Sequence, residues 1–130
     1  MIPWILAVLA LFVLQTLLPS IARGASKQPE QLAYLRSNRD EEPPHTVMSA
    51  RMAHALRNMF EALPVFLPLA LLAEMKGIES GWALTGAMVF FFARLVYVPA
   101  YGSGIALLRS ATWAVSFAGL VMMVVGLLQG

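Results

Sequence analysis

Five polar side chains lie at the start of a predicted helix whose later residues are almost all apolar. In the segment RMAHALRNMFEALPVF at 51–66 they are Arg51, His54, Arg57, Asn58 and Glu61. Positions 51, 54, 58 and 61 recur at intervals of three and four residues, so on a helix they form one polar stripe, with position 57 on its flank. The chain continues as LPVFLPLALLA. Ionisable groups so close to hydrocarbon are costly unless they face a partner, a cavity or a ligand.

Two further polar groups interrupt the later apolar segments. They are Arg94, Tyr97 and Tyr101, which share one helical face, and Arg109 and Ser110, which stand in the first turns of the last apolar segment. At 1.5 Å of rise per residue, and measured from the same side of the membrane, Glu61 lies about 21 Å deep, Arg94 about 18 Å and Arg109 about 28 Å. We therefore expect polar groups from three helices to meet in one layer.

The composition indicates the class of protein that must position this layer. Of 130 residues, 59% are hydrophobic and only 12% are charged, whereas a soluble domain carries about a quarter charged residues. We predict an all-α integral membrane protein, a four-transmembrane-helix up-down bundle in a single domain over residues 1–130. Its helices are expected at about 2–21, 47–75, 82–101 and 105–128. Gly86, Gly119 and Gly126 are expected to permit close contact between helices.

The first apolar segment and the loop after it determine the topology. Residues 2–18 lack charge and resemble a signal peptide, but the absence of Lys or Arg before the long apolar run favours a retained helix. The polar loop at 22–46 is expected to hold a short interfacial helix around Gln31–Leu35 and to end on Thr46, a helix cap. Because this loop holds four Lys or Arg residues, the positive-inside rule places it in the cytoplasm and both termini on the other side.

The predicted layer contains more cations than anions. Guanidinium groups bind carboxylates and phosphates through paired hydrogen bonds, so a small anionic ligand entering from the cytoplasm is expected, beside an apolar region open to lipid. Two simpler interpretations require no ligand. Arg57 and Glu61 could form a pair within one helix, and Arg94 could neutralise Glu61 between helices. The absence of cysteine excludes thiolate metal sites, no metal site is expected, and a net charge of +2 gives no reason to expect nucleic acid.

The order of these motifs resembles that of the MAPEG family, the membrane-associated proteins of eicosanoid and glutathione metabolism. The likeness is carried by R-N-x-x-E before a Pro-rich apolar run, by A-R-x-x-Y-x-x-x-Y and by a later Leu-Arg-Ser. These motifs comprise Arg57, Asn58, Glu61, Pro64 and Phe66, then Ala93, Arg94, Tyr97 and Tyr101, then Leu108, Arg109 and Ser110. The loop sequence NRDEEPP resembles that of the bacterial branch, which implies a multi-pass protein of the bacterial inner membrane.

The resemblance implies a homotrimer that binds glutathione between subunits near the cytoplasmic face. Arg109 would stabilise the glutathione thiolate, with Ser110 beside it. The residues implied or expected to bind the co-substrate are Arg51, His54, Arg57, Asn58, Glu61, Arg94, Tyr97 and Tyr101. This chain departs from the family pattern at His54, where several members have arginine, and at Trp113, where tyrosine often stands. Arg23 is similar to a first-helix arginine of the family.

The function implied is a glutathione-dependent membrane transferase or peroxidase, in which the thiolate attacks an apolar electrophile arriving from the bilayer. Two other classes stay open. A small four-helix transporter would use Glu61 to exchange protons for a cation, and a non-catalytic membrane protein would bind lipid headgroups through the same arginines. The sequence does not indicate which electrophile is used.

Overall fold

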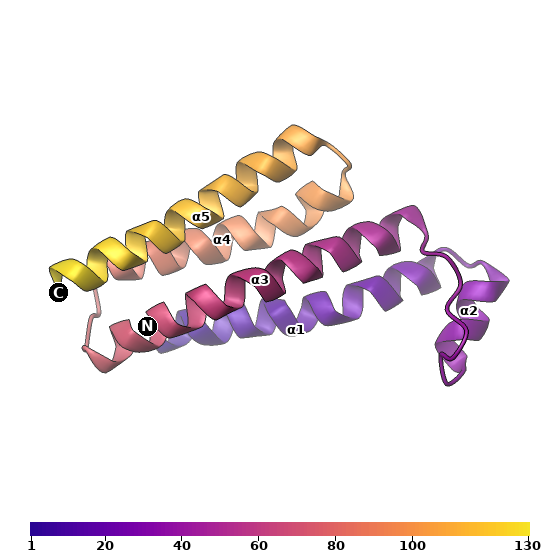
Figure 1. Cartoon of the computed structure of the whole chain (residues 1–130), viewed down its shortest axis with the longest axis horizontal. Helices are drawn as coiled ribbons and strands as arrows, with labels where there is room; N and C mark the ends of the chain where they lie inside the picture. The colour runs from indigo at the N-terminus through magenta and orange to yellow at the C-terminus, as the bar shows by residue number, and fades with distance from the viewer.

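The computed structural model describes all 130 residues and contains five helices and no strands. In chain order they are α1 (Ile2–Ala25), α2 (Pro29–Arg36), α3 (Val47–Met75), α4 (Trp82–Gly102) and α5 (Ala106–Gln129). All except α2 are long and apolar enough to cross a membrane. Figure 1 shows these four lying side by side, with α2 beyond one end of α1 and α3. The predicted all-α fold with four membrane-spanning segments is confirmed.

The helix bounds agree with the prediction most closely where local signals define them. Helix α3 has the predicted range, and at its start the Thr46 hydroxyl accepts a hydrogen bond from the Ser49 backbone N–H at 3.1 Å. Helix α2 covers the short helix expected in the loop. Helix α1 continues to Ala25 rather than ending near residue 21. Arg23 lies in its last turn and donates hydrogen bonds to Gln31 and Glu42 of the following segment.

Helix α3 joins the two halves of the bundle through its apolar side. The rings of Phe66 on α3 and Phe90 on α4 are both fully buried and stack with their centroids 4.6 Å apart and their planes 13° apart. Stacked aromatic pairs add to the stability gained from buried area alone. Farther along α1, Phe12 meets Phe60 of α3 edge-on at 4.9 Å. The polar stripe of α3 is thus left on another side of the helix.

Helices α4 and α5 make the most extensive contact of all helix pairs, and glycines allow their backbones to approach closely. A Cβ atom added at Gly119 would lie 2.8 Å from the Gly86 carbonyl oxygen and 2.8 Å from the Phe90 nitrogen. A Cβ added at Gly86 would lie 2.5 Å from the Gly119 carbonyl oxygen, and one added at Gly126 would meet the backbone of Ala83. The expectation that these three glycines permit close helix contact is confirmed.

Candidate functional site

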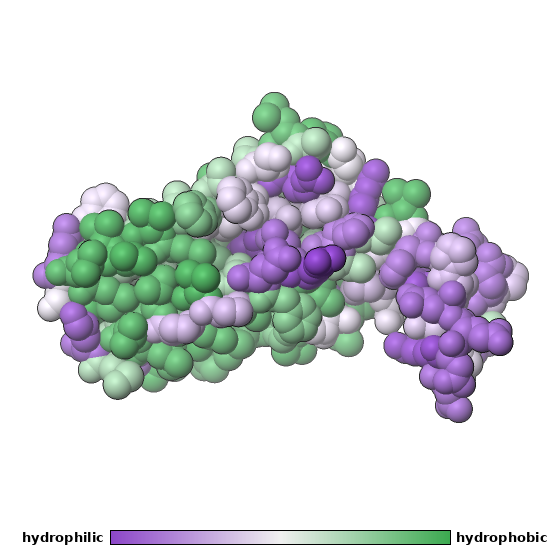
Figure 2. Space-filling model, in the orientation of Figure 1, coloured by the Kyte–Doolittle hydropathy of each residue, from purple (hydrophilic) through white to green (hydrophobic).

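A polar cleft opens on one face of the bundle, where residues of α3, α4 and α5 meet. Figure 2 shows hydrophilic side chains gathered in the middle of the molecule, beside a wide hydrophobic surface on the left. The cleft has a volume of about 410 Å³ and is lined by His54, Arg57, Asn58, Glu61, Tyr97, Tyr101, Arg109, Ser110 and Trp113. The structure therefore brings together all the predicted site residues except Arg51 and Arg94. Spacing along three separate helices was sufficient to predict this convergence.

Aromatic rings hold Arg109 on one wall of the polar cleft. The Arg109 guanidinium carbon lies 5.3 Å from the centroid of the Tyr101 ring. Tyr101 in turn meets Tyr97 edge-on at 5.7 Å and lies nearly parallel to the His54 ring at 6.3 Å. A guanidinium over an aromatic face is attracted by the ring quadrupole. This contact orients Arg109 without neutralising it, and no carboxylate lies within ion-pair distance of Arg109.

The one carboxylate of the polar cleft has a local partner. Glu61 Oε1 lies 3.7 Å from Arg57 Nε, one turn earlier on α3, and the two side chains are 65% and 80% exposed. An exposed pair of this kind contributes little to stability. The intrahelical pair considered from the sequence is therefore present, and it leaves Arg109 as an uncompensated cation in the cleft.

Arg94 does not line the polar cleft. It is 1% exposed, its guanidinium carbon lies 4.4 Å from the centroid of the Tyr97 ring, and its Nη1 donates to Asn58 Oδ1 at 2.6 Å. Its Nε and Nη2 are buried with no hydrogen-bond partner. No ion pair joins Arg94 to Glu61, so neutralisation of Glu61 does not explain its position. Its contacts instead orient the amide of Asn58.

An apolar groove adjoins the polar cleft and shares three lining residues with it, Asn58, Glu61 and Trp113. The groove has a volume of about 300 Å³, and its other lining residues are Ala62, Val65, Arg94, Ser116, Phe117, Leu120, Val121 and Val124. The sequence predicted an apolar region beside the anion site but not its residues. The sequence pattern that could have identified these residues is the recurrence of apolar side chains at positions 113, 117, 120 and 124 of α5, at intervals of three and four.

Arg51 also lies outside the polar cleft and contacts the turn between α4 and α5. Its Nη1 donates to the Gly102 carbonyl oxygen at 2.9 Å. A Cβ added at Gly104, whose φ is +76°, would lie 2.6 Å from Arg51 Nη2. Arg51, Tyr101 and Arg109 line a separate small cavity of about 120 Å³. Arg51 thus ties α3 to the turn from which α5 starts.

The loop outside the membrane-spanning segments is organised around Arg23. This side chain is 3% exposed, and it donates from Nη1 to Gln31 Oε1 at 2.6 Å and from Nη2 to Glu42 Oε1 at 2.6 Å. Its guanidinium carbon also lies 5.0 Å from the centroid of the Tyr34 ring. Because these contacts use its donors, we infer that Arg23 holds α2 and the following loop in place.

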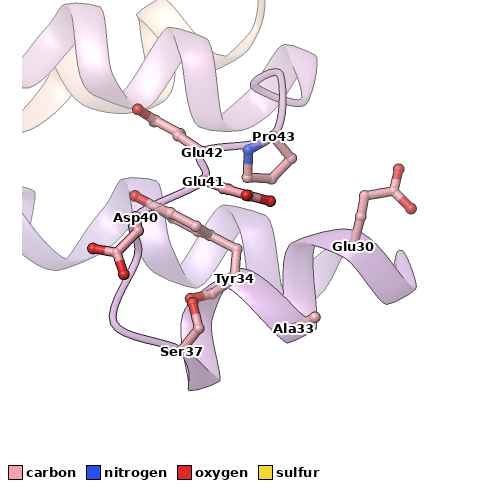
Figure 3. A pocket seen from close by; sticks show the side chains of 8 residues that line it. All are labelled: Glu30, Ala33, Tyr34, Ser37, Asp40, Glu41, Glu42 and Pro43. Atoms are coloured by element: carbon pink, nitrogen blue, oxygen red, sulfur yellow. The ribbon is translucent and has the colours of Figure 1, made fainter.

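The largest cavity of the molecule lies in this loop (Figure 3). Its volume is about 650 Å³, and its lining includes the four carboxylates of Glu30, Asp40, Glu41 and Glu42. These groups are not placed to hold a metal ion, and no cation lines the cavity. A cavity of this charge would repel an anion, so the smaller polar cleft is the better candidate for an anionic ligand.

The fold and these cavities together define a four-span helical membrane protein with a cationic cleft beside an apolar groove. The model of the MAPEG family matches residues 1–129, so the chain belongs to this family of membrane glutathione-related transferases and peroxidases. The resemblance read from the motifs is thereby confirmed over almost the whole chain. No curated protein matches the sequence closely enough to count as a relative.

Proposed function

We propose that this protein is a glutathione-dependent membrane transferase or peroxidase whose polar cleft binds glutathione. The observation that carries the proposal is Arg109, a guanidinium held by Tyr101 in the cleft and left without a carboxylate partner. Membership of the MAPEG family implies that the ligand is the thiol glutathione, and the charges in the polar cleft support this choice of ligand.

The polar cleft has groups that suit each charge of glutathione. The tripeptide carries two carboxylates, one ammonium group and one thiol. Arg57 and Arg109 suit the carboxylates and the sulfur, while Glu61 suits the ammonium group. Asn58, oriented by Arg94, adds an amide that both donates and accepts hydrogen bonds. The cleft thus offers cations in excess of anions, as the ligand requires.

Arg109 and Ser110 would activate the sulfur. An ordinary thiol has a pKa near 8.5 and is mostly protonated at neutral pH, and a neighbouring guanidinium favours the thiolate. Each tenfold gain in the thiolate-to-thiol ratio corresponds to about 1.4 kcal/mol. Arginine suits this role because it stays charged when partly desolvated. The Ser110 hydroxyl, next in the chain, would donate a further hydrogen bond to the sulfur.

The apolar groove would deliver the electrophile. It meets the polar cleft at Asn58, Glu61 and Trp113, so a molecule dissolved in the bilayer would reach the sulfur laterally. We further propose that residues 1–130 act as one domain in a homotrimer of the bacterial inner membrane, with the cleft near the cytoplasmic face. The four Lys or Arg residues of the loop at 22–46 support this orientation.

A glutathione titration of the purified protein, followed by ultraviolet absorbance of the thiolate, tests the proposal. The wild type should develop the thiolate signal at neutral pH, and Arg109→Ala should lose most of it. Arg36→Ala, which removes an exposed arginine of α2 outside the cleft, is the matched control and should resemble the wild type. A wild type that binds no glutathione, or an Arg109→Ala variant with an unchanged signal, would contradict the proposal.

One observation favours a second candidate, the non-catalytic protein that binds lipid headgroups. Arg51 and Arg109 line one small cavity at the start of α5, and neither has a carboxylate partner. A lipid phosphate would suit this pair. Because Arg109 lines both cavities, the two candidates are told apart in protein freed of phospholipid. A thiolate signal there supports glutathione binding, whereas binding of phosphatidylglycerol with no thiolate signal favours the lipid-binding protein.

A further inference from the structure

Three side chains of α3 contact the last residue of α4, Gly102. The Nη1 atom of Arg51 donates to the Gly102 carbonyl oxygen at 2.9 Å. A Cβ atom added at Gly102 would lie 3.5 Å from the Met48 sulfur and 3.3 Å from the Met52 Cε. The guanidinium and the two thioethers therefore hold the point of the backbone at which the turn to α5 begins.

The two methionines differ in their access to reagents from outside. Met52 is 7% exposed, whereas Met48, the second residue of α3, is 46% exposed. Met48 follows the loop that lies outside the membrane-spanning segments, so it stands at the level of the lipid headgroups. A hydroperoxide group on a lipid chain is polar and costly to bury in hydrocarbon. Such a group therefore collects at the same level as Met48.

We propose that Met48 is an oxidation site through which organic hydroperoxides weaken glutathione binding. The inference rests on the proposed function, because the affinity that changes is that of the polar cleft for glutathione. The chain has no cysteine, and oxidation of methionine is reversible and turns a flexible apolar side chain into a polar one. Met75 is 82% exposed but stands at the other end of α3 and lines no part of the cleft.

The reaction transfers one oxygen atom. A lone pair of the Met48 sulfur attacks the outer oxygen of the hydroperoxide, so that an S–O bond forms and the O–O bond breaks. The hydroperoxide proton passes to the oxygen that leaves, and the other product is an alcohol. The sulfur loses two electrons and the hydroperoxide gains them, so no further reactant is needed.

The new oxygen would compete for the Arg51 guanidinium. Arg51 follows Met48 by three residues, which places both on one side of α3. A sulfoxide oxygen accepts hydrogen bonds, so Arg51 can donate to it in place of the Gly102 carbonyl. Arg51 and Arg109 line one small cavity beside this turn. A turn released by Arg51 would no longer fix the start of α5, where Arg109 stands.

Treatment of the purified protein with tert-butyl hydroperoxide tests where oxidation occurs. The reagent is removed before any binding measurement. Peptide mass spectrometry should find the sulfoxide at the exposed Met48 and Met75 well before the buried Met52.

Hydrogen exchange then tests whether oxidation releases the turn. The Ser103 and Gly104 amides close this turn by donating to the Pro99 and Tyr101 carbonyl oxygens. Loss of one hydrogen bond corresponds to an about 2- to 12-fold change in an equilibrium. We expect these two amides to exchange faster by about this factor in the oxidised protein. This measurement needs no glutathione.

The glutathione titration tests the effect on the polar cleft. Oxidation of the wild type should weaken glutathione binding about 2- to 12-fold, and a methionine sulfoxide reductase should restore it. Met48→Leu keeps an apolar side chain that cannot take up oxygen, so it should bind like the untreated wild type before and after treatment. Met75→Leu is the matched control and should lose affinity as the wild type does. Met48→Gln, whose amide oxygen also accepts from Arg51, should bind weakly without peroxide.

The outcomes separate this inference from the proposed function. If oxidation weakens binding equally in Met48→Leu and in the wild type, or if Met48 stays reduced while Met75 is oxidised, the role of Met48 is overturned and the proposed function stands. If the untreated wild type binds no glutathione, the proposed function fails and hydrogen exchange alone decides the oxidation site. Faster exchange of the turn in the oxidised wild type but not in treated Met48→Leu then supports it, and unchanged exchange overturns it.

Discussion

Replacing Gly119 by alanine should push α4 and α5 apart. The added Cβ would lie 2.8 Å from the Gly86 carbonyl oxygen, 2.8 Å from the Phe90 nitrogen and 3.1 Å from the Phe90 Cα. All three are backbone atoms of α4, so no side-chain rotation relieves the contact. Because nonbonded heavy atoms are most stable about 3.5–4.0 Å apart, the helices would have to separate by roughly 1 Å.

The same substitution at Gly24 supplies a matched control. There the added Cβ would meet only Leu35 Cδ1, at 3.6 Å, which is an ordinary contact. Alanine gains up to about 1 kcal/mol over glycine in a helix interior, whereas overpacking costs about 1–3 kcal/mol. We therefore expect Gly119→Ala to destabilise the protein by roughly 0.5–2 kcal/mol. Gly24→Ala should be neutral or stabilising.

Thermal unfolding followed by circular dichroism, with all variants in one detergent, measures the difference. Gly119→Ala should unfold at a lower temperature than the wild type, and Gly24→Ala at the same or a higher temperature. If Gly119→Ala unfolds no earlier than Gly24→Ala, the close approach of α4 and α5 cannot be what requires glycine at this position.

The remaining predictions concern the contacts at the ends of the helices. Arg51→Met should weaken glutathione binding in the titration because it frees the Gly102 carbonyl and loosens the start of α5, and Gly104→Ala should have the same effect by displacing the guanidinium. Arg23→Met should expose the loop after α2 to limited proteolysis, which gel electrophoresis would detect, since it removes the contacts that hold this loop. Thr46→Ala should lower stability by about 0.5–2 kcal/mol in the same unfolding assay through loss of the helix cap.

The four long helices were predictable because length and hydropathy alone define them. The bounds of α3 were also predictable, since Thr46 caps its start and the chain turns polar after Met75. The end of α1 was not, because nothing in the sequence near Arg23 shows that Gln31 and Glu42 will hold it. Contacts between distant residues, rather than local propensity, determine that boundary.

For the site, spacing predicted the depth and helical face of each residue but not the direction of its side chain. Arg94 and Arg109 both belong to the predicted layer, yet Arg109 lines the polar cleft while Arg94 is buried against Tyr97 and Asn58. Arg51 begins the polar stripe and instead reaches the turn after α4. A long arginine side chain can follow several paths from one backbone position, so tertiary partners decide which cavity it lines.

The residues that pack the helices most tightly do not line the polar cleft or the apolar groove. The glycines pack α4 tightly against α5, and Phe66 and Phe90 join α3 to α4. Helices α3 and α5 both contribute to the buried core, and the polar cleft and the apolar groove lie where residues of α3, α4 and α5 meet. A ligand there would fill space that the side chains of α3, α4 and α5 leave open. Under the proposed function, a ligand in these cavities would leave the contacts of α4 with α5 and of Phe66 with Phe90 in place.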